Sequence, residues 1–290
     1  MGDYLVRAVD PDGQFRIFAA VTTETAEEGR KRHDTWPIAS AALGRALTAG
    51  LLLGANLKGD DLLTLRIQGD GPLGGILVSA NGAGEVRGYV LEPHVDLPSG
   101  VNGKLPVGAA VGSQGLLHVT KDLGLKEPFT GSVELVSGEI GEDTAQYLLV
   151  SEQTPSAVSL GVLVDADARV KAAGGLLVQL FPDAEEKVLS HLEQRLAALP
   201  PISSLVDSGL SPEEIILQAV DGLPLRFLER NPVSFTCRCS KEKTRDILAS
   251  LGAQELASLL EERGHAEVRC HFCGEIYLFY PADLTDVIGS

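Results

Sequence analysis

All four cysteines of this chain lie near its C-terminal end, in two close pairs. The first pair is Cys237-Arg238-Cys239, and after thirty further residues the second is Cys270-His271-Phe272-Cys273. Two short thiolate clips brought together supply the four soft donors that Zn²⁺ takes in a tetrahedron. Gly274 suits a tight knuckle whose backbone amides can point at a sulfur. The spacing therefore predicts one Zn²⁺ per chain, bound by Cys237, Cys239, Cys270 and Cys273.

Other interpretations compete with bound zinc. Structural disulfides would suit a secreted protein, but the opening Met1-Gly2-Asp3-Tyr4 lacks the basic segment and apolar run of a secretory signal. An iron–sulfur cluster fits this spacing less well. His265 or His271 could replace a cysteine, but four thiols complete the shell, so we expect both histidines to be solvated. The Cys-x-Cys clip is cramped, and an oxidant could join its sulfurs in a strained, reducible ring.

Charge and hydropathy exclude two classes of partner. The 290 residues include 40 acidic and 24 basic side chains, for a net charge of −16. A phosphate backbone needs a basic face, so we expect no nucleic-acid partner. Residues 38–55 imitate a membrane span, but Arg45 in the middle costs about 2.5–3.5 kcal/mol on an insertion scale. Pro37 and the small residues after it instead predict a fully buried helix, and we expect no membrane association.

The N-terminal part has the pattern of a β-sheet core around that buried helix. Helices are predicted at residues 23–33 and 143–153, and residues 92–114 are predicted to be irregular. The segment from Gly69 to Gly74 matches the G-x-G-x-x-G fingerprint, but a strand pattern follows it, so we interpret it as a turn and expect no nucleotide cofactor. Strands are predicted at residues 3–9, 14–22, 61–68, 75–80, 85–91, 116–122, 131–135, 157–164 and 170–181.

The pattern changes to helices near residue 182. Asp183 with Glu186, and Ser211 with Glu214, predict capping boxes that open two apolar helices. A connector of about fifty residues is far longer than an ordinary loop, and we expect it to hide apolar surface by docking elsewhere.

The last segment is small. Two helices, ended by Gly252 and Gly264, and a hairpin around the second clip offer little apolar core, so this piece needs a staple. Zinc can supply roughly 10–16 kcal/mol of apparent folding free energy. The predicted class is α+β, with an N-terminal β-sheet core packed around a buried helix (1–178), a helical linker (179–232) and a small C-terminal zinc domain with four cysteine ligands (233–290).

The sequence contains no Gly-x-Ser-x-Gly motif of the α/β-hydrolases, no His-Glu-x-x-His motif of the zinc proteases and no Walker phosphate-binding loop. His33 and His118 have no recognisable catalytic neighbours. We therefore expect no catalytic residues and no enzyme activity.

The cysteine pattern is accompanied by three further stretches. These are Gln68-Gly69-Asp70-Gly71-Pro72-Leu73-Gly74, the run from Phe129-Thr130-Gly131 to Gly138-Glu139-Ile140, and the run from Glu142-Asp143 to Ser151-Glu152-Gln153-Thr154-Pro155-Ser156-Ala157. In order and spacing, over essentially the whole chain, they resemble the 33 kDa chaperonin (heat shock protein 33) family.

The resemblance implies a cytoplasmic, ATP-independent holdase of the oxidative stress response. In that family the cysteines are zinc thiolates when reduced, and oxidation would convert them to two disulfides, Cys237–Cys239 and Cys270–Cys273, with zinc release. The active form is usually a homodimer that binds unfolding client proteins through exposed apolar surface.

The residues themselves suggest a consistent mechanism. Zn²⁺ keeps sulfurs deprotonated, and oxidants attack thiolates. Oxidation of one cysteine pair would remove two ligands, so the metal would leave. The small domain would then lose the free energy that folds it, and the connector would be released. Two alternatives stay open: a thiol–disulfide oxidoreductase that uses Cys270 and Cys273 as its dithiol, and a constitutive zinc-stabilised adaptor.

Overall fold

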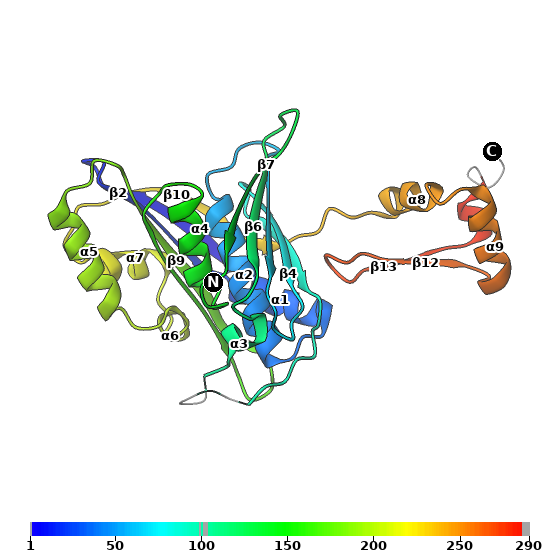
Figure 1. Ribbon diagram of the computed structural model, residues 1–290, viewed down its shortest axis with the longest axis horizontal. Coiled ribbons are helices and arrows are strands. Elements are labelled where there is room, and N and C mark those ends of the chain that lie inside the picture. The colour runs from blue at the N-terminus through cyan, green and yellow to red at the C-terminus, as the bar shows by residue number, and fades with distance from the viewer. Residues whose placement is uncertain (1, 99, 101–103, 286–290) are drawn as a thin grey trace. The chain divides into compact units, whose positions relative to one another are not determined.

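The computed structural model describes residues 2–98, 100 and 104–285 (Figure 1). It contains two compact units, Met1–Thr236 and Cys237–Ser290, which we call unit 1 and unit 2. The class is α+β, as predicted. The helical connector packs within unit 1, so the division of that unit into a core at 1–178 and a linker at 179–232 stays a prediction.

Two sheets build the described part of unit 1. Sheet A has the strand order β10-β1-β2-β9-β8, and sheet B has the order β11-β5-β4-β3-β6-β7. Neighbours are antiparallel except β11, which runs parallel to β5. The strands are β1 (Tyr4–Val9), β2 (Phe15–Val21), β3 (Leu62–Gln68), β4 (Ile76–Asn81), β5 (Glu85–Val90), β6 (Leu116–Asp122), β7 (Phe129–Glu134), β8 (Ser156–Val164), β9 (Val170–Leu180), β10 (Arg226–Pro232) and β11 (Ser234–Phe235).

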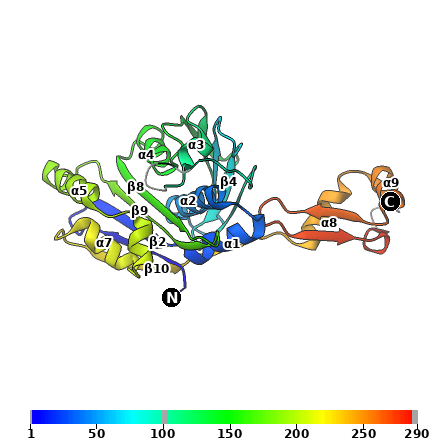
Figure 2. The same ribbon diagram turned by 90° about the horizontal axis from the view of Figure 1, so that it is seen from below.

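The helix α2 (Pro37–Gly54) lies between the two sheets and forms the main core with both (Figure 2). It is long and apolar enough to cross a membrane by those criteria alone, but 89% of it is buried inside the protein, which is the packing of a core helix. Glycines in α2 let the sheets pack closely against the helix. A Cβ on Gly44, for example, would lie 2.9 Å from a methyl of Val162 in sheet A. The other helices of this part are α1 (Thr23–His33), α3 (Val107–Val111) and α4 (Gly141–Val150).

The cation inside α2 has a partner. Arg45 is 9% exposed, and its Nη1 lies 2.6 Å from Oε2 of Glu139. Burial disfavours the charged form of Glu139, but Arg45, together with the charge of Lys104 and the backbone of Gly108, holds the pKa of Glu139 below its ordinary value. The ion pair therefore explains how the helix carries a charge at its centre.

The connector covers the face of sheet A that α2 leaves free. It forms α5 (Glu186–Ala198), α6 (Ile202–Asp207) and α7 (Pro212–Val220). Its buried apolar side chains make a second core with the sheet. That core comprises Val188, Leu192, Ile202, Leu205, Ile215, Ile216, Ala219 and Val220 from the connector, and Tyr4, Val6, Ala8, Phe15, Ile17, Ala19, Leu176 and Val178 from the sheet.

The two predicted capping boxes have different outcomes. The box of Ser211 and Glu214 is confirmed, since the amide of Glu214 donates to Oγ of Ser211 and the amide of Ser211 donates back to Glu214. The box of Asp183 and Glu186 is wrong: α5 begins only at Glu186, with Glu185 as the N-cap and no side-chain capping bond.

Four elements in the described part of unit 1 were not predicted: α3, α6, β10 and β11. Residues 107–111 form α3 inside the segment expected to be irregular, and residues 226–232 form β10. Strand β10 returns from the end of the connector to pair with β1, with Tyr4 opposite Pro232. The turn assigned to the glycine-rich segment is confirmed, because Gly71 and Leu73 donate to the α3 region and strand β4 follows.

Unit 2 has a core of its own. It contains α8 (Lys241–Ala249), α9 (Ala253–Arg263), the hairpin β12 (Ala266–Arg269) with β13 (Ile276–Phe279), and a 3₁₀ turn at Pro281–Asp283. Gly264 ends α9 in the left-handed region, as predicted, whereas Gly252 is the N-cap of α9 and does not cap α8. Among its described residues, the buried apolar side chains of this core are few: Leu248, Leu256, Leu260, Ala266, Phe279 and Leu284.

The packing of α2 predicts a contrast between two of its glycines. A Cβ on Gly50 would lie 2.7 Å from Cγ1 of Val78, whereas one on Gly54 would make ordinary contact with Cβ of Ala80 at 3.5 Å. Overpacking costs about 1–3 kcal/mol, against a helix gain of about 1 kcal/mol. We expect Gly50→Ala to be less stable than Gly54→Ala by at least about 1 kcal/mol in chemical denaturation. Equal stabilities would show that the sheet yields at Val78.

Candidate metal centre

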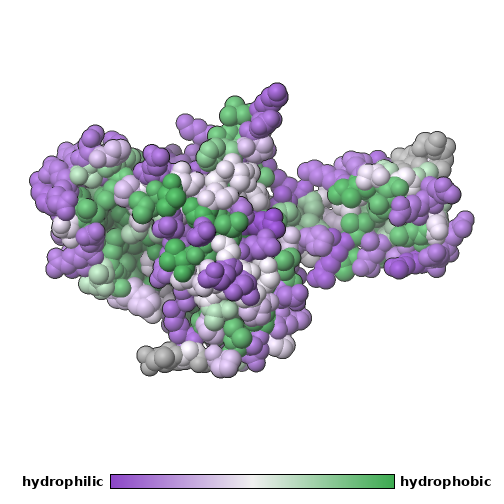
Figure 3. Space-filling model, viewed as in Figure 1, coloured by the Kyte–Doolittle hydropathy of each residue, from purple (hydrophilic) through white to green (hydrophobic). Residues whose placement is uncertain are grey.

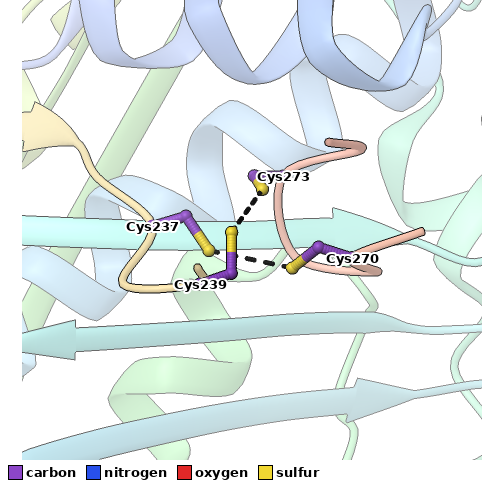
Figure 4. Close-up of side chains that lie close together, drawn as sticks. All are labelled: Cys237, Cys239, Cys270 and Cys273. Atoms are coloured by element: carbon purple, nitrogen blue, oxygen red, sulfur yellow. Dashed lines mark hydrogen bonds between the residues drawn. The ribbon is translucent and has the colours of Figure 1, made fainter. Parts of the chain in front are cut away.

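The four cysteines converge at one point in unit 2. Their sulfurs all lie within 4.8 Å of one another (Figure 4). The Sγ atoms of Cys237 and Cys270 are 3.8 Å apart, and those of Cys239 and Cys273 are 3.4 Å apart. Cys273 is buried and the other three are half-buried. The structure therefore brings together all four predicted ligands, none of which is in a disulfide.

The first clip is fixed by the helix that follows it. Cys239 directly precedes Ser240, the N-cap of α8, whose Oγ accepts a hydrogen bond from the amide of Lys243. The ammonium of Lys243 donates to the carbonyl of Arg238 inside the clip at 3.1 Å. The first clip therefore lies at the N-terminus of α8, where negative charge is favoured.

The second clip is the loop of the β12–β13 hairpin. The amide of Cys270 donates to the carbonyl of Glu275, and the amide of Gly274 donates to the carbonyl of Cys270. Gly274 has φ +72°, the left-handed conformation that glycine adopts easily. Backbone amides of Phe272 and Cys273 donate to the sulfur of Cys270. The predicted knuckle with amides aimed at a sulfur is therefore confirmed.

Burial opposes charge on these sulfurs. Desolvation raises the pKa of Cys270 and of Cys273 above the ordinary thiol value, despite the backbone amides that favour their thiolates. Four thiolates at this spacing would also repel one another. A bound cation would compensate for both effects, because metal ligation deprotonates a thiol outright.

The donor set and spacing fit a tetrahedral ion. With Zn–S bonds of about 2.3 Å, the sulfurs of a regular tetrahedron lie about 3.8 Å apart. The two contacts above, at 3.8 and 3.4 Å, are close to that edge. Four sulfurs and no oxygen ligand favour a soft or borderline ion such as Zn²⁺ over Mg²⁺ or Ca²⁺. Cys237, Cys239, Cys270 and Cys273 would hold it.

One residue of the site was not predicted. Tyr277, on β13, donates its hydroxyl to Sγ of Cys239 at 3.1 Å, and this hydrogen bond raises the pKa of the phenol. The sequence shows only a tyrosine in a short strand, because the bond joins residues that are far apart in the chain.

The histidines lie outside the four-sulfur cluster. The Nδ1 of His265 lies 3.2 Å from the carbonyl oxygen of Arg263, and its ring faces Tyr280, while His271 is exposed. In unit 1, Nδ1 of His118 lies 2.6 Å from Oγ of Ser132, and the ring of His33 packs near Tyr89 and Phe235.

Comparison with known proteins gives consistent similarities over the whole chain. A family profile described as "Hsp33 protein" matches residues 3–280. The chain is 61% identical to the 33 kDa chaperonin of Desulforamulus reducens over 288 residues, covering 99% of this chain and 98% of that protein. It is 53% identical to the 33 kDa chaperonin of a Geobacillus species, covering 98% and 96%.

A solved structure agrees with the sequence relatives. The crystal structure of the 33 kDa chaperonin (heat shock protein 33 homolog) of Thermotoga maritima superposes with a TM-score of 0.92 at 36% identity. The match covers 99% of this chain and 98% of that one.

The geometry predicts the consequence of losing one ligand. Reduced Cys273→Ser should hold far less zinc than the parent after dialysis, because a hydroxyl replaces a buried thiolate ligand. His271→Ala, in the same knuckle, should keep one ion per chain. Elemental analysis measures both, and X-ray absorption of the parent should show four sulfurs at about 2.3 Å. Nitrogen or oxygen in the first shell would contradict the four-sulfur site.

Proposed function

The chain belongs to the Hsp33 family, and we propose that it is a redox-regulated, ATP-independent holdase that protects unfolding proteins under oxidative stress. Its relatives are named chaperonins, which places it among chaperones that bind client proteins and not among enzymes. The finer proposal is that oxidation of zinc-bound cysteines, with release of the metal, switches client binding on.

One observation carries this proposal: four convergent sulfurs lie in a small unit that directly follows an apolar connector in the chain. In the resting state a bound Zn²⁺ would keep the four sulfurs as thiolates. The apparent binding free energy of structural zinc, about 10–16 kcal/mol, is comparable with the stability of a whole domain. With few buried apolar side chains, unit 2 would depend on it.

Peroxide is the simplest oxidant for such a site. Two thiolates, one H₂O₂ and two protons give one disulfide and two water molecules, so two equivalents of peroxide oxidise one chain. We assign the disulfides to Cys237–Cys239 and Cys270–Cys273, as the family resemblance implies. Each disulfide removes two ligands together.

The choice of disulfide partners decides whether unit 2 can unfold after oxidation. The sulfurs of Cys237 and Cys270, 3.8 Å apart, and those of Cys239 and Cys273, 3.4 Å apart, belong to different clips. Disulfides across the clips would cross-link both ends of unit 2 and stabilise it by closing a loop. Disulfides within the clips leave no covalent link between them, so only these allow unit 2 to unfold when the metal leaves.

The chain order supports a path from the clips to the connector. Strand β11 lies just before Cys237 and is short, with the amide of Thr236 donating to Val86 beyond its end. Before β11, the exposed edge strand β10 ties the end of the connector to β1. Unfolding of the chain after Thr236 would fray β11 and then β10, and the connector would lose its C-terminal attachment.

The connector is lightly held at its other end. In α5 only Val188 and Leu192 are buried, and a groove of about 170 Å³ separates the helix from β8 and β9. On the face shown in Figure 3, apolar side chains gather between α5 and α4. In the last turn of α4, Leu149 and Val150 are more than half exposed. Release of α5 would extend an apolar surface that is already partly open to clients.

The remaining parts of the proposal concern context. We assign the protein to the cytoplasm, where thiols stay reduced, and expect a homodimer when active, with no nucleic-acid or membrane partner. Against the oxidoreductase alternative, Cys270 and Cys273 lie in a hairpin loop, whereas a thioredoxin-type dithiol opens a helix. The constitutive adaptor requires activity with zinc bound, which is the opposite dependence.

The switch predicts opposite behaviour of one sample before and after oxidation. Peroxide with mild heat should release zinc, reduce the helix signal and make the segment after about residue 183 protease-sensitive, while the core stays folded. Aggregation of an unfolding client should be suppressed only then, without ATP, and dithiothreitol with zinc should reverse it. Suppression by the reduced, zinc-loaded protein would support the adaptor, and disulfides across the clips would contradict the unfolding step.

Release of the connector should be sufficient for activity. Ile216 in α7 is fully buried against sheet A, while its neighbour Leu217 is 52% exposed. Ile216→Asp places a charge in that core and should undock the connector, since a buried unpaired charge is very costly. We expect this variant to suppress aggregation in reductant with zinc bound, and Leu217→Asp to stay inactive. If the connector of the Ile216→Asp variant is protease-sensitive but the variant does not suppress aggregation, the idea that connector release exposes the client-binding surface is wrong.

A further inference from the structure

Tyr277 is a side chain of the metal centre that contacts a predicted ligand without being one. Its hydroxyl donates to Sγ of Cys239 at 3.1 Å. The residue is held in the β12–β13 hairpin opposite Val268, and its ring packs against the core of unit 2. The strand pairing and the core packing together hold the phenol next to the sulfur of Cys239.

A hydrogen bond to a sulfur ligand has two effects. It withdraws electron density from the thiolate, which lowers its nucleophilicity toward an oxidant, and it stabilises the ligand in its metal-binding orientation. The amides of Phe272 and Cys273, which favour the thiolate of Cys270, belong to the backbone and are retained under substitution. Tyr277 supplies its bond from a side chain, so the sequence can set the strength of this one.

Resting on the function proposed above, we propose that Tyr277 is a positioning residue that sets the oxidation threshold of the switch. It holds Cys239 in the metal site and makes its sulfur the less reactive member of the first clip. The phenol therefore keeps the cluster closed against low oxidant, and its removal lowers the amount of peroxide needed.

Tyr280 offers a matched control. It follows the same strand, is 53% exposed, and its ring faces His265 and not the sulfurs. Tyr277→Phe and Tyr280→Phe each delete one hydroxyl and keep the ring, so both variants should retain the helix content of unit 2.

The experiment uses the full-length, reduced, zinc-loaded chain. Zinc affinity is measured by competition with a chromogenic chelator, and zinc release is followed under peroxide. Tyr277→Phe should bind zinc about tenfold more weakly and release it several-fold faster, with Tyr280→Phe equal to the parent. Limited alkylation, read by peptide mass spectrometry, should show the excess label at Cys239. With Co²⁺ in place of Zn²⁺, the sulfur-to-cobalt absorption band should shift only in Tyr277→Phe.

Two results would overturn the proposal. One is an affinity and release rate unchanged in Tyr277→Phe. The other is equally increased alkylation of all four cysteines in Tyr277→Phe, together with a loss of helix content. That result would mean that Tyr277 acts only in folding. A parent protein that binds no metal would refute the proposed function itself, and that measurement is made before any variant is compared.

Discussion

Sheet A is apolar on both faces, and much of the structure follows from that constraint. Its inner strands β2 and β9 are buried along nearly their whole length. Strands of this kind need cover on both sides. Helix α2 covers one side, and the connector helices must cover the other. The connector is therefore a shield for a surface that the N-terminal part cannot bury by itself, which is a stronger role than that of a spacer between two units.

The two units meet the same physical problem in different ways. Unit 1 has a large continuous core and can leave part of its cover weakly attached. The described residues of unit 2 form a small apolar cluster, so in the proposed function the fold of this unit would depend on metal binding at the four sulfurs. In that proposal, oxidation of four sulfur atoms would act on about fifty residues, because the described part of unit 2 has no large core to resist it. In the proposed switch, a bound ion would give both the thiolate character that oxidants attack and the folding free energy that their attack removes.

The sequence predicts those features whose signals are local. The paired cysteines, the buried helix beginning at Pro37 and the box opened by Ser211 depend on spacings of a few residues, and the structure contains all three. Strand β10 and the bond from Tyr277 to Cys239 depend on partners remote in the chain, which no local pattern reveals. The capping box predicted at Asp183 is absent because Asp183 lies in a turn and α5 begins only at Glu186.

The pairing of β1 with β10 also bears on how the protein is made. Tyr4 lies opposite Pro232, so the edge of β1 is closed by a strand synthesised 228 residues later. At about 5–20 residues per second, the interval between them on a ribosome is roughly 10–50 s. During that time the nascent chain carries an apolar sheet face without its connector and a strand edge without its partner, both of which favour aggregation. The same surface thus meets solvent once before its cover has been translated and, in the proposed active state, a second time when the cover is released.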